Sequence, residues 1–340
     1  MPPQQDGLVV AVTGPTGTFG HGLLPLLEAE PRVRRVVGIA RRPFDPSQHG
    51  WSKMEYRRGD VRDRDALVDA FAGVDAVVHL AFLITGTGRR EDIRQVNVEG
   101  TRNTFEAARE AGVNRFVYAS SVAAYGFHPD NPIGMTEDWP VRPAARLFYA
   151  QEKAELEQLL AEEAAASPRP ELYLLRPPIV LGPHAAGAKA TIPEPLTRAA
   201  LGVLGLAGRL KVPIPALAAN VPMQFIHEAD VGQALLRCVL GDGPPGAYNI
   251  AGDGVVTGSD VIRELGLMPM PIPAGAVYAA TRTLAQIPWP GLVPPAAEWV
   301  EAFSHPAIMD TSKARQELGW SPGYSGIEAL RDTLPQLGRS

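Results

Sequence analysis

Residues 8–20 read LVVAVTGPTGTFG, and this stretch decides the fold. Leu8–Thr13 is an unbroken, largely β-branched run, which is typical of a strand that helices cover on both faces. Gly14, Gly17 and Gly20 follow it, and helical periodicity begins at the last of them. A glycine-rich turn between a first strand and a first helix lets backbone approach a pyrophosphate at the helix N-terminus. The stretch therefore predicts a phosphate loop that binds a dinucleotide.

Strand-like and helix-like segments alternate through the first half of the chain. After the first strand, we expect strands at Val33–Ala40, Asp75–Ala81, Arg115–Ser120 and Leu172–Arg176. The expected helices are Gly20–Ala29, Asp63–Ala72, Ile93–Ala111 and Arg146–Ala166. Strands separated by helix-length segments indicate βαβ units. We predict an α/β fold, namely a Rossmann-type, doubly wound parallel sheet with a smaller C-terminal substrate lobe.

The composition changes after about residue 181, and seven prolines fall within residues 269–295. A strand and a helix return at Met223–Ile226 and Glu228–Leu240, followed by a strand at Ala247–Ala251. We expect two domains. Residues 1–181 with about 222–252 form the dinucleotide-binding domain, and about 182–221 and 253–340 form the substrate-binding lobe.

The composition argues against several classes of protein. The chain has 340 residues, a net charge of −5 and one cysteine, Cys238. The negative charge gives no reason to expect a nucleic-acid partner, and one cysteine excludes an internal disulfide or a multi-cysteine metal site. The longest uncharged apolar stretches fall short of the roughly 20 residues that cross a membrane, and no signal-peptide pattern opens the sequence. We expect a cytoplasmic protein with no metal ion and no membrane partner.

The end of the second expected strand bears on the choice of dinucleotide. It reads Gly38-Ile39-Ala40-Arg41-Arg42 and contains no carboxylate. An acidic residue there would hydrogen-bond the ribose 2′-hydroxyl of NAD, whereas an arginine fork matches the 2′-phosphate of NADP. We therefore predict NADP as the cofactor, with NAD the less favoured alternative. The alternative interpretation is that Arg41 and Arg42 only form a solvated turn.

A tyrosine and a lysine lie four residues apart in Tyr149-Ala150-Gln151-Glu152-Lys153, so both side chains share one helical face. A free phenol has a pKa near 10, which makes it a poor base at neutral pH. An adjacent ammonium lowers that pKa by about 1–3 units, so the phenol could then exchange a proton with a carbonyl/alcohol pair. Ser120 and Ser121 end the fourth expected strand, where a parallel sheet opens onto its ligand crevice.

Together these motifs resemble the extended, epimerase-like branch of the short-chain dehydrogenase/reductase family. The resemblance covers nearly the whole chain, and the segments that carry it are Thr13–Gly20, Gly59–Asp63, His79–Ala81, Asn97–Asn103, Ser120–Gly126, Leu175–Pro178, Phe225–Val231 and Asp310–Trp320. Family members often pair the helices that correspond to Ile93–Ala111 and Arg146–Ala166 across a two-fold axis. The resemblance therefore also implies a homodimer.

The resemblance implies a role for each matched residue. Tyr149 would be the acid/base, Lys153 would tune it and hold the nicotinamide ribose, and Ser121, rather than Ser120, would bind the reacting oxygen. Asn97 would be structural or hold a water, and Asp230 would cap a helix. The residues expected to contact the cofactor are Gly14, Thr16, Gly17, Thr18, Phe19, Gly20, Arg41, Arg42, Asp60, Val61, Leu80, Ala81, Tyr149, Lys153 and Pro177.

The residues that would recognise a substrate differ from those of the family's nucleotide-sugar enzymes. Their diphosphate-holding asparagine would fall at Ile179 or its neighbour, and their arginine within Val221–Gln224, and both are missing. A diphosphate without such donors binds poorly. The remaining cations in this region, which could still serve a phosphate, are Lys189, Arg198, Arg209 and Lys211. The favoured interpretation is that they are solvated charges on helix surfaces.

The segments expected to line the substrate, residues 185–223, 265–280 and 287–295, are mostly apolar, which suits a substrate with an apolar body. We predict an oxidoreductase that exchanges hydride between NAD(P) and a carbonyl or alcohol on a largely apolar small molecule. A nucleotide-sugar epimerase or dehydratase is the alternative. A non-catalytic NADP-binding sensor is the second alternative.

Overall fold

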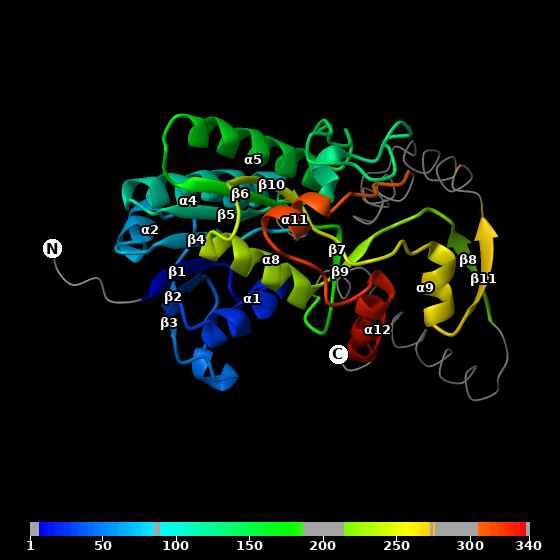
Figure 1. Ribbon diagram of the computed structural model, residues 1–340, viewed down its shortest axis with the longest axis horizontal. Coiled ribbons are helices and arrows are strands. Elements are labelled where there is room, and N and C mark those ends of the chain that lie inside the picture. Colours follow the sequence, from blue (N-terminus) through cyan, green and yellow to red (C-terminus); the bar gives the residue numbers. More distant parts are fainter. Residues whose placement is uncertain (1–6, 85–88, 186–213, 273–274, 276–304, 338–340) are drawn as a thin grey trace.

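The computed structural model describes residues 7–84, 89–185, 214–272, 275 and 305–337. Its centre is a parallel sheet of seven strands in the order β10–β6–β5–β4–β1–β2–β3 (Figure 1). The strands are β1 (Leu8–Thr13), β2 (Val33–Ala40), β3 (Met54–Arg58), β4 (Ala76–His79), β5 (Arg115–Ala119), β6 (Glu171–Arg176) and β10 (Gly246–Asn249). This arrangement confirms the predicted doubly wound α/β fold.

Successive side chains of β1 pack alternately into two hydrophobic cores, one on each face of the sheet. Val10 and Val12 belong to the core under one layer of helices, and Val9 and Ala11 belong to the core under the other. The first layer contains α1 (Thr18–Ala29), α8 (Glu228–Leu240) and α11 (Ser312–Glu317). The second layer contains α2 (Arg64–Ala70), α4 (Gly100–Glu110) and α5 (Phe148–Ala165). Burial of both faces explains the unbroken apolar run in the first strand.

Two of the expected elements take a different form in the structure. The helix expected over Ile93–Ala111 is divided into α3 (Arg90–Arg94), a π-helical turn η2 (Gln95–Glu99) and α4. The strand expected at Met223–Ile226 is β9 (Phe225–His227), which pairs with β7 (Ile179–Leu181) outside the large sheet. The short 3-10 helices η1 (Pro46–His49) and η3 (Val122–Tyr125) follow β2 and β5.

A smaller group of elements lies at the far end of the molecule from β1–β3 (Figure 1). It contains β8 (Pro215–Ala219) paired with β11 (Met268–Ile272), and the helices α9 (Gly258–Glu264) and α12 (Gly326–Leu337). Within the described residues, every helix is too short or too polar to span a lipid bilayer.

The strand order reverses between β1 and β4, which are hydrogen-bonded neighbours. In an open parallel sheet, a ligand binds outside the carboxyl ends of the strands at such a reversal. Gly14 follows β1, Leu80 follows β4 and Ser120 follows β5. The fold therefore brings the segments predicted to hold a cofactor to one edge of the sheet.

Candidate active site

The loop between β1 and α1 has the packing of a phosphate-binding turn. Gly14 has a φ of +68°, and a Cβ there would lie 2.8 Å from the backbone nitrogen of Ala81. A Cβ on Gly20 would lie 1.9 Å from the carbonyl oxygen of Pro15. Gly17 is exposed, and a Cβ there would come only within 3.5 Å of the Gly14 oxygen. The first and third glycines are thus required by the protein's own packing, whereas the middle one faces open space that a ligand can enter.

Helix α1 begins directly at this loop. Gly17 is its N-cap residue, and no side chain among the described residues caps it. The N–H groups of the first turn are then available to an anion, and the helix dipole favours negative charge there. The backbone of this turn fits the pyrophosphate of a dinucleotide.

The structure brings Ser121, Tyr149 and Lys153 together. Ser121 follows β5 and hydrogen-bonds the Tyr149 hydroxyl at the start of α5. The Lys153 ammonium lies one helical turn further on, 5.8 Å from the centre of the Tyr149 ring. It donates to the carbonyl oxygen of Ala119 at 2.6 Å and to the Tyr118 hydroxyl at 3.1 Å. These are the groups that carbonyl/alcohol chemistry needs: a phenol, a hydroxyl and an ammonium.

Burial dominates the electrostatics of this trio. It raises the pKa of Tyr149 to about 12, and the hydrogen bond from Ser121 only partly opposes that shift. Burial also lowers the pKa of Lys153 to about 7, against the opposing influence of Glu157 and Glu152. The prediction that the ammonium lowers the pKa of the phenol is therefore wrong for this structure, because loss of solvent acts on both groups more strongly than they act on each other.

A buried ion pair joins helix α5 to strand β6. Arg176 at the end of β6 donates to both carboxylate oxygens of Glu157 on α5, at 2.9 and 2.6 Å. Ser120 donates to the same carboxylate at 2.5 Å. The pair ties α5, and with it Tyr149 and Lys153, to the sheet. It also explains why Ser121 and not Ser120 faces Tyr149, since the Ser120 hydroxyl is committed to Glu157.

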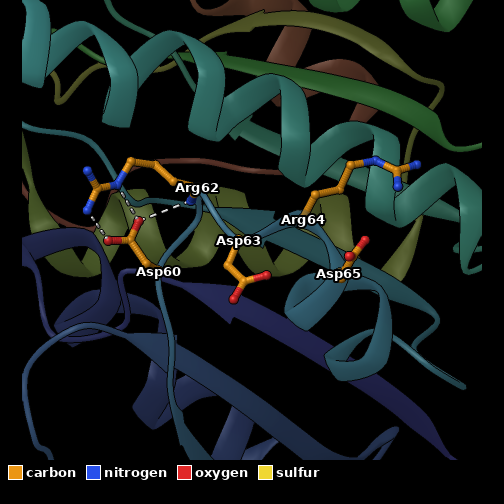
Figure 2. A pocket seen from close by; sticks show the side chains of 5 residues that line it. All are labelled: Asp60, Arg62, Asp63, Arg64 and Asp65. Carbon is orange, nitrogen blue, oxygen red and sulfur yellow. Dashed lines mark hydrogen bonds and ion pairs between the residues drawn. The ribbon is translucent and has the colours of Figure 1, made fainter.

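The segment after β3, predicted to contact adenine, lies beside a surface pocket. Figure 2 shows the pocket, about 520 Å³ in volume, with the side chains that line it: Asp60, Arg62, Asp63, Arg64 and Asp65. The Asp60 carboxylate accepts from the backbone nitrogen and the guanidinium of Arg62, which lowers the pKa of Asp60. Val61 is buried beneath them. The segment is thus folded into a defined shape by its own hydrogen bonds.

The exposed turn that carries Arg41 and Arg42 is held by strand β3, which sequence reasoning missed. The Tyr56 hydroxyl lies 2.9 Å from the carbonyl oxygen of Ala40 and also contacts that of Arg42. Arg58 donates through Nε to the carbonyl oxygen of Arg41 at 3.0 Å. The carbonyl oxygens of Ala40, Arg41 and Arg42 therefore all accept hydrogen bonds from β3. Arg58 is thereby placed next to Arg41 and Arg42.

The remaining residues predicted at the cofactor lie on the same edge of the sheet. The Leu80 nitrogen donates to the Thr13 oxygen at 3.0 Å, which places Leu80 and Ala81 next to the phosphate loop. Thr18 donates through its hydroxyl to the carbonyl oxygen of His184 at 2.8 Å. Pro177 is buried and accepts from the backbone nitrogen of Val122. Thr16 and Phe19 lie in or next to the loop and are partly exposed.

The expectation that Asp230 caps helix α8 is wrong. The N-cap is His227, whose ring accepts from the backbone nitrogen of Ala229. Asp230 lies in the first turn and accepts from the backbone nitrogens of Gly323 and Tyr324 at 2.7 and 3.1 Å. It therefore anchors a late turn of the chain, a contact that no local pattern around residue 230 indicates.

Known proteins are similar to this chain in sequence and in architecture. Residues 10–251 match the model of the NAD dependent epimerase/dehydratase family. A ceramide reductase of Caulobacter vibrioides is 29% identical over 92% of this chain and 86% of its own length. An N-acetyl-α-D-glucosaminyl-diphospho-ditrans,octacis-undecaprenol 4-epimerase of Escherichia coli is 31% identical over 52% of this chain and 50% of its own. The solved dTDP-glucose 4,6-dehydratase of Bacillus anthracis, in complex with NAD, is 15% identical, with a TM-score of 0.70 over 98% of this chain and 97% of its own.

The fold and the site thus define an extended short-chain dehydrogenase/reductase. The chain belongs to the NAD dependent epimerase/dehydratase family. It is an enzyme of a family that works with a nicotinamide dinucleotide.

Proposed function

We propose that this enzyme is an NADP(H)-dependent oxidoreductase that acts on a carbonyl or alcohol of a largely apolar small molecule. The observation that carries the proposal is the hydrogen bond between Ser121 and Tyr149 next to the buried amine of Lys153, at the carboxyl edge of the sheet. Within such a site, a carbonyl oxygen can receive hydrogen bonds from two hydroxyl groups at once.

When bound, the nicotinamide ring supplies hydride exchange with a carbon that bears oxygen. Ser121 would orient and polarise the reacting oxygen. Tyr149 would hold the proton at its hydroxyl and pass it to that oxygen or take it back. Lys153 would hydrogen-bond the nicotinamide ribose. Because burial keeps the pKa of Tyr149 high, the phenol is protonated in this structure and is prepared to donate.

Arg41 and Arg42, supported by Arg58, are the reason to favour NADP over NAD. All three follow or border the end of β2, where the adenosine ribose of a dinucleotide lies in this class of fold. Guanidinium groups pair with phosphate through two parallel hydrogen bonds. Tyr56 and Arg58 hold the backbone of this turn, so binding of a 2′-phosphate would not require the main chain to be ordered first.

Two features favour an apolar substrate. The Gln224 side chain both accepts from and donates to the backbone of Met309, at 2.8 and 3.1 Å, so its oxygen and one of its two N–H groups are already used within the protein. In the described part of the small lobe, Leu217 is 67% exposed and pairs in register with Met270, which is 47% exposed. The similarity to the ceramide reductase, whose name indicates a lipid substrate, supports the same proposal. The candidate phosphate-binding cations Lys189, Arg198, Arg209 and Lys211 and most of the expected lining segments lie outside the described residues.

Nucleotide-sugar epimerisation or dehydration is the second candidate. The Escherichia coli relative, whose name indicates an epimerase of a sugar carried on undecaprenol diphosphate, supports epimerisation as the type of reaction. Ile179, which stands near the family's diphosphate-binding asparagine position, is 40% exposed on β7 and offers no side-chain donor. The two candidates differ in their products. Epimerisation converts a nucleotide sugar with no net change in nicotinamide absorbance, whereas reduction of a ketone or aldehyde consumes NADPH stoichiometrically.

We further propose a cytoplasmic homodimer in which each chain is divided as the sequence suggests. Residues 1–181 with about 222–252 would bind the cofactor, and about 182–221 and 253–340 would bind the substrate. The contribution of β10 to the large sheet, next to β6, supports assigning residues near 246–249 to the cofactor domain.

The experiment that tests the proposed function is a screen of apolar ketones, aldehydes and alcohols with NADPH or NADP, followed by the Tyr149→Phe variant. We expect Tyr149→Phe to lower kcat by about 10²–10⁴-fold, because the proton donor is lost. The dissociation constant of NADPH should stay within about twofold, since the ring keeps its packing and only a hydroxyl is removed. An active substrate whose turnover does not depend on Tyr149 would refute the proposal.

A further inference from the structure

A chain of buried hydrogen bonds runs beneath the turn that follows β4. His79 Nδ1 lies 2.7 Å from the Thr13 hydroxyl, and His79 Nε2 lies 2.9 Å from the Thr101 hydroxyl. The Thr101 hydroxyl lies 2.5 Å from the backbone carbonyl oxygen of Asn97. All these groups are at most 1% exposed. The chain connects β1, β4 and the helical segment that carries Asn97.

The direction of every hydrogen bond in this chain can be deduced. A carbonyl oxygen only accepts, so Thr101 donates to Asn97 and must accept from His79 Nε2–H. His79 Nδ1 is then an acceptor for the Thr13 hydroxyl, whose oxygen accepts from the Ala81 nitrogen at 3.4 Å. A neutral ring is needed for this arrangement, and burial lowers the pKa of His79 to about 3. These hydrogen bonds thus hold Ala81, near the start of the turn, next to Thr13.

Asn97 fixes the other end of the turn with its side chain. Its Oδ1 accepts from the Leu83 nitrogen at 2.8 Å, and its Nδ2 donates to the Leu83 oxygen at 3.0 Å. The same Nδ2 donates to Glu152 Oε2 at 2.7 Å. Asn97 lies in the π-helical turn η2, an irregularity that often marks functional positions. Ala81 and Leu83 are therefore both tethered, and only Phe82 is left to project between them.

Phe82 covers the active-site amine. The centre of its ring lies 3.7 Å from Lys153 Nζ, and the ring meets that of Tyr149 edge-on at 5.6 Å. A cation over an aromatic face is stabilised by the ring quadrupole, more so when water is excluded. Lys153 is only 3% exposed, and the Phe82 ring is one of the groups that cover it, with Tyr118 and Ala119. The turn therefore controls both the position and the accessibility of this amine.

Glu152 lies at the end of this set of hydrogen bonds, and the roles of Ser121, Tyr149 and Lys153 do not explain it. It is 1% exposed, and its Oε1 atom is buried without a hydrogen-bond partner among the described residues. A half-satisfied buried carboxyl group is costly, so its retention calls for a reason. Its Oε2 atom bonds Asn97, which in turn bonds the turn that carries Phe82.

We propose that Glu152 is a positioning residue that locks Asn97 onto Leu83 and so holds Phe82 over the amine of Lys153. This goes beyond the proposed function and rests on it only for the role of Lys153. Without the carboxylate, Asn97 loses a partner, the turn opens more often, and Lys153 is exposed to solvent.

The test is the rate at which Lys153 is reductively methylated, followed by peptide mass spectrometry at neutral pH. Glu152→Met removes the acceptor, and Glu152→Gln keeps one. We expect labelling of Lys153 to be about tenfold faster in E152M, the size expected for one lost hydrogen bond, and to stay within about twofold in E152Q. Lys53 and Lys313 serve as internal references, and Glu162→Gln, at an exposed site on the same helix, is the matched control.

The affinity for NADPH, measured by its fluorescence, is the second readout. E152M should weaken binding by about tenfold and E152Q by about twofold at most, because Ala81 and Phe82 border the cofactor edge. Should E152M fail to fold, Asn97→Ser removes the bond to Glu152 together with both bonds to Leu83, and carries the same expectation. Unchanged labelling of Lys153 in the folded variant would overturn the inference.

Failure of this inference and failure of the proposed function give different results. Labelling of Lys153 needs neither substrate nor cofactor, so it reports only on how Glu152 and Asn97 hold Phe82 over the amine. Turnover that survives Tyr149→Phe would refute the proposed function but would not bear on the role of Glu152. Labelling of Lys153 at the wild-type rate in E152M would refute the role of Glu152 and leave the proposed function standing.

Discussion

Lys153 is the residue through which pH acts most directly on this site. Its amine lies between the Ala119 carbonyl, the Tyr118 hydroxyl and the Phe82 ring, away from solvent. Burial lowers its pKa from 10.5 to about 7, so the folded protein disfavours the charged form. The cost of burying that charge is fully present below pH 7. Between pH 7 and 10.5 only the unfolded chain carries the charge, so the folded state gains relative stability as the pH rises.

We therefore predict a pH-dependent difference between the wild type and Lys153→Met. As the pH rises from 7 to 10, the wild type should gain stability relative to K153M by up to about 1.4 kcal/mol per pH unit. Thermal denaturation of both proteins at several pH values measures this, and other titrating groups cancel in the comparison. A difference that stays constant with pH would show that the amine is not desolvated in the folded state.

The second prediction at the scale of single residues concerns Arg41 and Arg42. Replacing either with alanine should raise the dissociation constant of NADPH by about 10–100-fold, the range expected for lost hydrogen bonds to a charged group. Binding of NADH should hardly change, because it has no 2′-phosphate. Fluorescence titration with both nucleotides provides the measurement.

Arg57→Ala is the matched control for those substitutions. Arg57 lies on β3 next to Arg58, but its guanidinium pairs with Glu55. The Arg57→Ala substitution should change the dissociation constant of neither NADPH nor NADH. Equal losses for NADPH and NADH in R41A and R42A would mean that the turn binds no 2′-phosphate.

At the scale of elements, the three glycines of the β1–α1 loop serve different purposes. Gly20 allows the helix to pack against Pro15, whereas Gly17 keeps the loop open on its outer side. Glycine-rich loops are often treated as a single motif. In this loop Gly20 is required for the folded protein to pack, whereas Gly17 leaves space for a ligand.

This division predicts opposite outcomes for two small substitutions. Gly20→Ala should destabilise the protein by about 1–3 kcal/mol, because its Cβ overlaps the Pro15 carbonyl. Gly17→Ala should leave the melting temperature nearly unchanged and weaken dinucleotide binding by about tenfold, through loss of close backbone contact. Calorimetry and NADPH titration of both variants separate the effects. A stable G17A protein with normal affinity would place the cofactor elsewhere.

Most of the large sheet was predictable because its strands are buried on both faces and so appear as continuous apolar runs. Strand β3 was missed because it lies at the edge of the sheet and reads MEYRR, with only Met54 buried. The π-helical turn at Gln95–Glu99 was missed because a helical pattern looks alike whether one residue is inserted or not.

The candidate site shows the same limit. The sequence alone identifies three residues of the site. Tyr149 and Lys153 form a local motif, and Ser121 lies at the end of a recognisable strand. The sequence does not identify Phe82 and Glu152, because their importance depends on contacts with Lys153 and Asn97 that only the folded chain creates. Helix α5 buries Glu152, Lys153 and Glu157 on one side, and such charged residues in a helix would normally be assigned to solvent.

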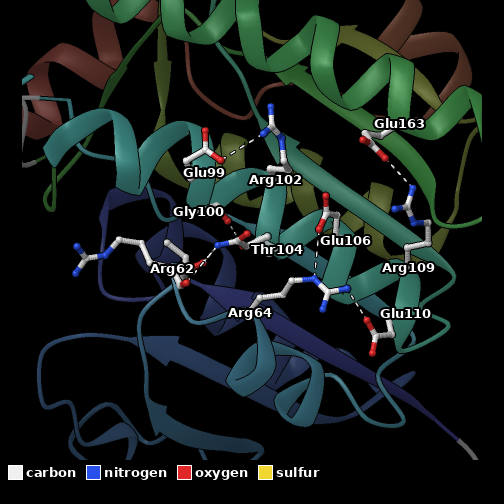
Figure 3. A network of polar contacts seen from close by, with 12 residues as sticks. Arg62, Arg64, Glu99, Gly100, Arg102, Thr104, Glu106, Arg109, Glu110 and Glu163 are labelled. Atoms are coloured by element: carbon white, nitrogen blue, oxygen red, sulfur yellow. Dashed lines mark hydrogen bonds and ion pairs between the residues drawn. The ribbon is translucent and has the colours of Figure 1, made fainter. Parts of the chain in front are cut away.

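At the scale of the whole molecule, α4 and α5 lie side by side and form an outer surface. Figure 3 shows the ion pairs across this region, among them Arg109 with Glu163 and Arg64 with Glu106 and Glu110. A groove of about 590 Å³ runs between the two helices. Its lining residues are Arg102, Glu106, Glu155, Gln158, Leu159, Glu162, Glu163 and Ala166. Charges of both signs on one surface can pair with their own two-fold copy, which suits an isologous interface.

If this surface forms the proposed homodimer, Leu159→Arg should separate the protomers, because a buried, unpaired charge in the interface is costly. Light scattering after gel filtration should show a change from twice the chain mass of 36.4 kDa to the chain mass itself. Leu217→Arg, at an exposed position on β8, is the control and should leave the mass unchanged. Ser121, Tyr149 and Lys153 come from one chain, so the separated L159R protomer should still bind NADPH. A monomeric wild type, or an L159R protein that remains dimeric, would exclude this interface.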